Sequence, residues 1–175
     1  MRSLFRPVLP ALLLVVLVAG GCDVLRRDEL GEVPSEAEAA EFYARHADVS
    51  AVDVKGNVIE LHVRQPGDQL RRGGSLWARV GPYVYLLSPA TRGLFEAYPA
   101  VAAVRVVTST DRDREVARAM LRRDALGPSQ WRHAEALLGH ALQPGTKQPR
   151  MLERLAEWGE RYAEYDYNPE FVPTR

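Results

Sequence analysis

Cys22 is the only cysteine in the chain, and it directly follows an apolar run over residues 11–21. With one cysteine, no disulfide can form within the chain, so the fold must be stabilised by the packing of apolar side chains. The run is also too short for a simple membrane-spanning anchor, because residues 8–21 cover only 14 positions and include Pro10, whereas about 20 apolar residues cross the hydrocarbon core. The sequence therefore predicts a short leader and a body without cross-links.

The residues around Cys22 have the parts of an export signal. Arg2 and Arg6 precede the apolar run, and the small residues 19–21 end it. This segment resembles the signal of bacterial lipoproteins, in which a cysteine after small residues receives a diacylglyceryl group and becomes the mature N-terminus. The resemblance implies a signal peptide at residues 1–21 and a lipid on Cys22. A cleaved secretory signal without lipid is the alternative.

The same resemblance predicts a location in the bacterial cell envelope, lipid-anchored and facing the periplasm. Asp23 resembles a signal for retention in the inner membrane and favours that membrane. Residues 22–34 are polar after the cysteine and carry charges of both signs, so we interpret them as the lipid anchor and a tether. The membrane is thus one expected partner, through the lipid on Cys22, and another envelope protein is the second.

The charge balance argues against nucleic acid as a partner. The chain has 23 basic and 23 acidic residues, and Arg2 and Arg6 belong to the predicted signal, so the part after residue 21 has a formal charge of −2. It has no excess of positive charge to attract a polyanion. Its length is typical of one domain, which we place at residues 35–175.

Local patterns predict how this domain begins. Ser35 and Glu38 form a capping box that opens a helix of about 11 residues. Residues 49–54 and 58–64 are rich in β-branched side chains and flank a short Gly-Asn connection, so they predict a β-hairpin. The second strand alternates apolar and polar residues, which predicts that one face of the sheet is wet.

The middle of the chain predicts a loop, a broken helix and a strand. Residues 65–75 have the composition of a loop that ends at a pair of glycines. Residues 76–98 are long and apolar, but Pro82 and Pro89 disfavour helix in the residue before each of them. We expect a broken helix there, firmest from about residue 89 to 97, and a third strand over residues 101–108.

Residues 109–126 fit two structures. A turn at residues 111–114 followed by a strand puts Ala117 and Leu121 on one face, whereas a helix capped by Thr110 fits the composition nearly as well. We favour the strand because strand, charged turn and strand repeat the pattern of the first hairpin.

The C-terminal part predicts two helices and a tail. Apolar residues recur at three and four positions over residues 131–141 and at heptad-like spacing over residues 149–165, with a turn at residues 143–148. We expect an antiparallel helix pair and, over residues 165–175, an extended aromatic tail on the surface. The fold class is α+β: a small antiparallel or mixed sheet of three to four strands packed against a helix, with the helix pair at the C-terminus.

The order helix, strand, strand, helix, strand over residues 35–108 is similar to the BON domain, a small envelope module that binds membranes or periplasmic partners. Its matching points are Gly56, Val58, Val104 and Val106. Glu60 and His62 stand where that family prefers leucine and glycine, and prolines interrupt the middle helix. The similarity implies this topology and an envelope partner.

The sequence holds no catalytic signature that we recognise. Its serines lack settings such as G-x-S-x-G, and the acidic stretch from Asp111 lacks the glycine and final acid of a calcium loop. His133 and His140 are two helical turns apart, about 10 Å, too far to share one ion. We therefore expect no catalytic residue, no metal and no cofactor, and we lean towards a protein that is not an enzyme.

Two aromatic clusters are the candidate interaction surface, because tyrosine and tryptophan are common at protein interfaces. Their members are Trp77, Tyr83, Tyr85, Tyr165, Tyr167 and Phe171. We expect most of them to pack in the core or hold the tail, and the rest to line a protein-binding groove.

Three functions remain open. The leading hypothesis is an envelope lipoprotein that acts as a non-enzymatic protein-interaction or assembly module at a bacterial membrane. A periplasmic enzyme of unrecognised type would need a deep pocket joining His62 or His133 to acidic neighbours. A small-ligand-binding lipoprotein would need an apolar cavity beneath the middle helix.

Overall fold

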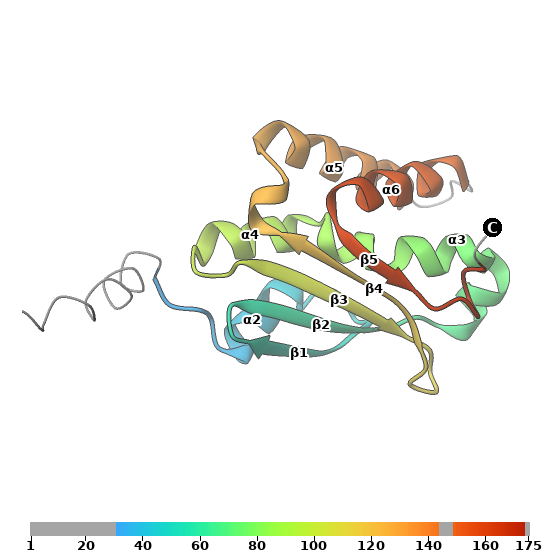
Figure 1. Cartoon of the computed structure of the whole chain (residues 1–175), viewed down its shortest axis with the longest axis horizontal. Coiled ribbons are helices and arrows are strands. Elements are labelled where there is room, and N and C mark those ends of the chain that lie inside the picture. Colours follow the sequence, from blue (N-terminus) through green and yellow to red (C-terminus); the bar gives the residue numbers. More distant parts are fainter. Residues whose placement is uncertain (1–30, 144–148, 174–175) are drawn as a thin grey trace, which may run out of the picture. The chain divides into compact units, whose positions relative to one another are not determined.

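The chain folds around a mixed sheet of five strands (Figure 1). The computed structural model describes residues 31–143 and 149–173. The strands are β1 (Val49–Lys55), β2 (Val58–Arg64), β3 (Ala103–Ser109), β4 (Glu115–Arg122) and β5 (Glu164–Tyr167), and they lie side by side in that order. Among these described strands, the β2–β3 pair is parallel and the other neighbouring pairs are antiparallel. The predicted α+β class is confirmed, with one strand more than the three to four expected.

The first elements follow their local sequence signals. Helix α2 (Glu36–Tyr43) begins after Ser35, whose hydroxyl accepts the Glu38 N–H while the Glu38 carboxylate accepts the Ser35 N–H. The capping box is confirmed, although the helix has 8 residues and is shorter than predicted. The β1–β2 hairpin turns at Gly56, whose φ of 65° is the left-handed conformation that such a turn requires.

Helix α3 (Gly67–Leu86) corrects the prediction of a loop at residues 65–75. Gly74 has φ 57° and ψ −148°, so two helical segments meet at a kink there rather than at the end of a loop. The first segment is helical because Leu70 packs in a small apolar cluster with residues of β4 and of the C-terminal segment. Helix α4 (Pro89–Ala97) follows after a break at Leu87 and Ser88, which confirms the predicted break before Pro89, whereas Pro82 lies inside α3 and does not end it.

The strand reading of residues 109–126 is confirmed by β4, whose Ala117 and Leu121 are buried. Helices α5 (Pro128–Ala141) and α6 (Pro149–Tyr162) then form the predicted pair. Their antiparallel direction brings His133, early in α5, to a ring distance of 5.8 Å from Trp158, late in α6. Residues 144–148 of the predicted turn lie outside the described residues.

The end of the chain departs from the extended surface tail that we predicted. Residues 164–167 form β5, which pairs antiparallel with β4 and becomes an edge of the sheet. Asn168 continues this attachment, because its N–H donates to the Val116 carbonyl and its side chain donates to the Glu115 carbonyl. The tail is therefore part of the sheet rather than a cover laid on it.

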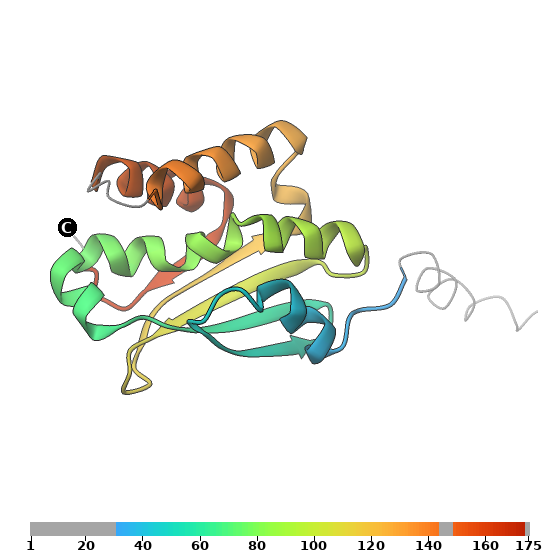
Figure 2. The same cartoon turned by 180° about the vertical axis from the view of Figure 1, so that it is seen from behind.

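The sheet is covered by helices on one face (Figures 1 and 2). Helices α2, α3 and α4 lie on that face, and α6 packs against α3. The core lies between them, where Ile59, Leu61 and Val104 are fully buried together with residues of α3 and α4. The face of β1–β4 that is turned to the viewer in Figure 1 carries no described helix.

Candidate functional site

The aromatic residues singled out by the sequence occupy different surroundings. Tyr83 and Tyr85 are buried, with exposed fractions of 0% and 6%, and Trp77 is half-buried against the core. Tyr167 and Phe171 are half-buried, whereas Tyr165 is 49% exposed. Most of these residues thus pack, as expected, and the two buried tyrosines of α3 offer little surface to a partner.

The structure brings the two aromatic clusters together at one point. The hydroxyl of Tyr83 lies 2.9 Å from that of Tyr167, which also donates to Glu160 Oε1 at 2.9 Å. Arg79 makes a bidentate bond with the same carboxylate. This network joins α3, α6 and β5. Cys22, with the predicted signal and most of the tether, lies outside the described residues.

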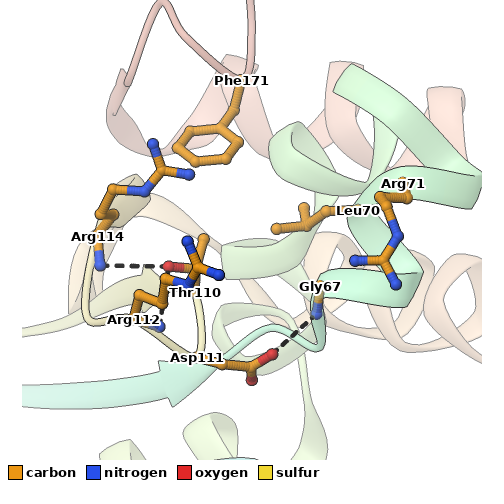
Figure 3. Close-up of a pocket in the computed structure, with 8 residues that line it drawn as sticks. All are labelled: Gly67, Leu70, Arg71, Thr110, Asp111, Arg112, Arg114 and Phe171. Carbon is orange, nitrogen blue, oxygen red and sulfur yellow. Dashed lines mark hydrogen bonds between the residues drawn. The ribbon is translucent and has the colours of Figure 1, made fainter.

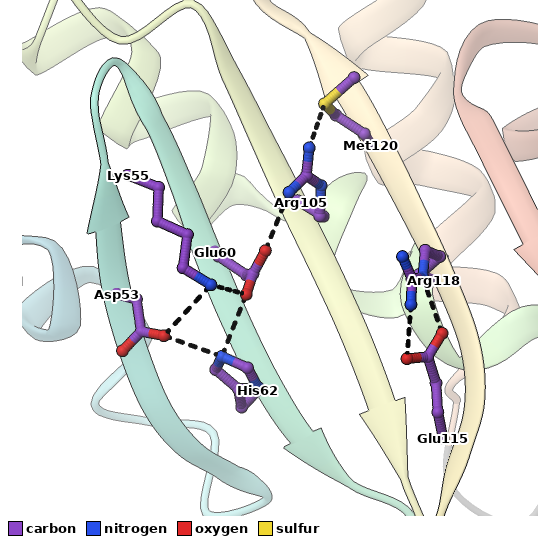
Figure 4. A network of polar contacts seen from close by, with 8 residues as sticks. All are labelled: Asp53, Lys55, Glu60, His62, Arg105, Glu115, Arg118 and Met120. Carbon is purple, nitrogen blue, oxygen red and sulfur yellow. Dashed lines mark hydrogen bonds and ion pairs between the residues drawn. The ribbon is translucent and has the colours of Figure 1, made fainter.

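The uncovered face of the sheet is lined by charged side chains in cross-strand rows (Figure 4). The strand register places Asp53 opposite Glu60, Glu60 opposite Arg105, and Arg105 opposite Met120. In the next row, His62 of β2 and Arg118 of β4 both lie opposite Val107 of β3. The wet face predicted from the alternation in β2 is therefore the uncovered face.

Glu60 is the centre of this face. Its side chain is only 8% exposed, and three groups contact its two oxygens. Oε1 lies 2.5 Å from Lys55 Nζ and 3.3 Å from His62 Nε2, and Oε2 accepts from Arg105 Nη1 at 3.0 Å. His62 Nε2 also lies 3.0 Å from Asp53 Oδ2. The sheet thus gathers two carboxylates, an imidazole and two cations at one point.

Electrostatics at Glu60 favours the ionised acid. Burial opposes ionisation, but the bonds from Lys55 and Arg105 outweigh it, so the pKa of Glu60 lies below its ordinary value. The hydrogen bond that the Lys55 ammonium donates to Glu60 raises the pKa of Lys55. Glu60 and Lys55 therefore stabilise each other in their ionised forms. Asp53, Glu60 and His62 offer three donor atoms within 4.8 Å of one another. Within residues 31–143 and 149–173, these three residues are the group whose spacing suits a metal ion.

A second feature is a cavity of about 470 Å³ where the start of α3 meets the β3–β4 turn (Figure 3). Arg71, Arg112 and Arg114 line it, with Leu70 and Phe171 as its apolar part. Its positive charge is partly offset, because Arg71 is paired with Asp68, Arg114 bonds Glu170 and the Asp111 carboxylate accepts the Gly67 N–H.

A third feature is a groove of about 490 Å³ between α2 and the edge strand β1. Small side chains of α2 and its C-cap, Ala37, Ala40 and Ala44, line one side of it. Val49, Ser50, Ala51 and Val52 of β1 line the other side. Among the strands within residues 31–143 and 149–173, β1 pairs with β2 alone, so its second edge lies beside this groove. The groove therefore combines a largely apolar lining with the outer edge of a strand, where the Val49 N–H donates to the His46 carbonyl.

Sequence reasoning did not find either the charged cluster or the groove. The pattern of β2 showed that Glu60 and His62 share a face, but only the register places Asp53 opposite Glu60 and the parallel pairing brings Arg105 beside it. The hairpin pattern could have revealed the first of these pairs. Nothing in the sequence signals that β1 is an edge.

The comparisons give this chain no family. Neither the models of known protein families, nor the curated proteins, nor the solved structures contain a significant match to it. Within the part of the chain that the structure describes, no helix combines the length and the hydropathy that crossing a membrane requires. The charged cluster, the arginine-lined cavity and the groove are therefore the features that bear on function.

Proposed function

We propose that the protein is a lipid-anchored, non-enzymatic interaction module of the bacterial cell envelope, which binds an extended segment of another envelope protein along the free edge of β1. The observation that carries the binding mode is the groove beside that edge, lined by α2 on one side and β1 on the other.

The anchor is supported by the sequence around Cys22. The lone cysteine follows an apolar run that ends in small residues, and a diacylglyceryl group there would hold the protein at the membrane with its body in the periplasm. Asp23 favours the inner membrane. Tethering suits an interaction module, because it raises the effective concentration of the domain near membrane partners without any added contact surface.

The free edge of β1 suits an extended partner. In an antiparallel pair, residues alternate between those that bond the neighbouring strand and those whose N–H and C=O groups point away from it. About half of the backbone groups of β1 therefore point to the free edge, where another extended chain can pair with them in register. The bulge between Val49 and Ala51 and the charge of Lys55 discourage indiscriminate pairing between copies.

The groove defines the chemistry of the segment that fits. Its alanine side accepts apolar side chains of small or β-branched shape, and the valines of β1 lie opposite. Glu41 lines the same groove, so a basic residue in the segment gains a favourable charge contact. The expected ligand is thus an extended peptide that alternates apolar and polar residues and carries a lysine or arginine.

The alternatives receive less support. His62 has acidic neighbours, but they lie on a sheet face without a covering helix, and His133 is exposed beside Trp158. The cavity at the start of α3 is lined by arginines, whereas a small-ligand carrier calls for an apolar one. The groove therefore favours an interaction module over an enzyme or a carrier.

The test begins with peptides rather than with a lysate. A displayed library of random peptides is selected on the full chain in detergent, and hydrogen exchange of the protein is measured with and without a selected peptide. We expect slower exchange at the amides of β1, because strand addition bonds them. Ala44→Trp fills the groove and should abolish binding, whereas Ala136→Trp on the exposed side of α5 should leave it unchanged.

Two results would overturn the binding mode. One is a selected peptide that slows exchange elsewhere and leaves the amides of β1 unprotected. The other is equal binding by the Ala44→Trp and Ala136→Trp variants, since only the first change narrows the groove.

A further inference from the structure

We propose that Asp53, Glu60 and His62 form a binding site for a divalent transition-metal ion of the Zn²⁺ type on the uncovered face of the β1–β2 hairpin. This site is separate from the groove between α2 and β1. A metal ion there would be a further ligand of the protein, one that the sequence did not predict.

The donor atoms already have the spacing that one ion requires. His62 Nε2 lies 3.0 Å from Asp53 Oδ2 and 3.3 Å from Glu60 Oε1, and all three atoms lie within 4.8 Å of one another. Two ligands of a tetrahedral zinc ion, each bonded at about 2.0–2.1 Å, are about 3.3 Å apart. The three side chains therefore reach one ion with small rotations and no movement of the strands.

The sheet holds these donors in place (Figure 4). Asp53 and Glu60 are directly opposite in the antiparallel register, and His62 is two residues further along β2 on the same face. Arg105 Nη1 bonds Glu60 Oε2 at 3.0 Å, so Oε1 is the oxygen that lies beside His62 and Lys55. Such an outer partner orients a ligating carboxylate in metal sites.

The ammonium group of Lys55 already lies between the carboxylates of the proposed site. Lys55 Nζ lies 2.5 Å from Glu60 Oε1 and 3.7 Å from Asp53 Oδ2. Its side chain is 54% exposed, so the ammonium can move into water when a stronger cation arrives. The ammonium neutralises the carboxylates in the metal-free protein and competes with the metal.

The donor set selects the class of ion. One imidazole nitrogen and two carboxylate oxygens, with water in the fourth position, match the ligands that zinc takes in proteins. Calcium needs six to eight oxygens and magnesium a near-octahedral oxygen shell. The site therefore favours Zn²⁺ over either of them.

The experiment is a calorimetric titration of the full chain with Zn²⁺ at neutral pH. The protein carries no histidine tag, and it bears Cys22→Ser so that the thiol cannot bind metal. We expect one ion per chain. His62→Ala should weaken binding by about tenfold or more, while Lys55→Met should strengthen it by at least about threefold, since it removes a competing charge. His140→Ala alters an exposed histidine on α5 and should change nothing.

His62→Ala and Lys55→Met should change the Zn²⁺ affinity in opposite directions, and this keeps the test independent of folding. A variant that merely unfolds binds more weakly, so tighter binding by Lys55→Met cannot come from damage, and melting curves without metal check His62→Ala. The proposal is overturned if Zn²⁺ does not bind, if His62→Ala and His140→Ala weaken binding equally, or if Lys55→Met fails to tighten it. Equal affinity for Mg²⁺ or Ca²⁺ would also overturn it.

Discussion

The hydroxyl of Tyr83 in α3 donates to the hydroxyl of Tyr167 in β5, at 2.9 Å. The direction follows from the third partner: Tyr167 gives its only proton to Glu160 Oε1, which as a carboxylate can only accept. Burial raises the pKa of both phenols, so both stay protonated. A chain of donors thus fixes the C-terminal strand to two helices.

Tyr167→Phe should destabilise the protein by about 1–2 kcal/mol, because it leaves the Tyr83 hydroxyl without its acceptor and removes a donor from Glu160. Denaturant unfolding measures the loss. Tyr165→Phe is the control, since that side chain is 49% exposed and should have little effect. Equal losses in the two variants would contradict the role of the hydroxyl.

Gly159→Ala should cost about 1–3 kcal/mol through overpacking. A Cβ at Gly159 would lie 2.3 Å from Cδ1 of Tyr83, whose ring is fully buried and cannot move away. Gly139→Ala is a matched change on α5, where a Cβ meets nothing within 4 Å, and it should stabilise the helix by up to about 1 kcal/mol. Thermal unfolding of the two variants should therefore shift in opposite directions.

The Arg123 side chain binds backbone carbonyl groups at and just after the C-terminal end of α4. Its guanidinium donates to the carbonyls of Val101, at 2.7 Å, and of Phe95 and Tyr98, and its burial lowers its pKa. Arg123→Ala should cost about 2–3 kcal/mol, since it removes charge-assisted bonds to these carbonyls. Arg122→Ala, which loses only an exposed pair with Asp124, should stay within about 1 kcal/mol of wild type. Denaturant unfolding of both variants measures the difference.

The capping box of α2 should weaken in acid. The hydrogen bonds from Ser35 lower the pKa of Glu38 below its ordinary value of 4.5. A carboxyl whose pKa is lower in the folded protein contributes stability above the unfolded value and loses it as pH falls through the folded one. We expect the carboxyl carbon of Glu38 to titrate below pH 4.5 in an NMR experiment, and closer to that value in Ser35→Ala. An ordinary midpoint in the wild type would contradict this.

Lipidation is tested by intact mass. Protein extracted from membranes of the expressing bacterium should be heavier than the sequence after residue 21 predicts, by the mass of a diacylglyceryl group or more. Cys22→Ser should show no such increase and should leave the membrane fraction. A wild-type chain of unmodified mass would exclude the anchor and leave a secreted protein.

Short sequence signals predicted most of the elements correctly. Ser35 and Glu38 lie within one turn, and the Gly56 turn joins adjacent strands, so each signal contains nearly all the atoms that decide its structure. The strand over residues 115–122 was found by analogy with that hairpin. In each case the deciding contacts are local.

Predictions failed where distant contacts decide. Residues 67–75 have a loop-like composition, yet they form a helix. Leu70 packs in a cluster with Val116 and with Phe171, which is about a hundred residues later in the sequence. This packing overrides the weak local helix propensity. Residues 164–167 become a strand because β4 offers them an edge. The charged cluster depends in the same way on register, which no single strand reveals.

The strand order has a consequence for the time course of folding. Strands β1 to β4 lie in the sheet in their chain order, so each can pair with a strand that has already emerged when the chain crosses a membrane from its N-terminal end. Strand β5 is separated from β4 by two helices, so it can join the sheet only after α5 and α6 have followed β4. A chain truncated before Glu164 therefore exposes the second edge of β4. The unpaired N–H and C=O groups of such an edge can pair with another chain, and this promotes aggregation.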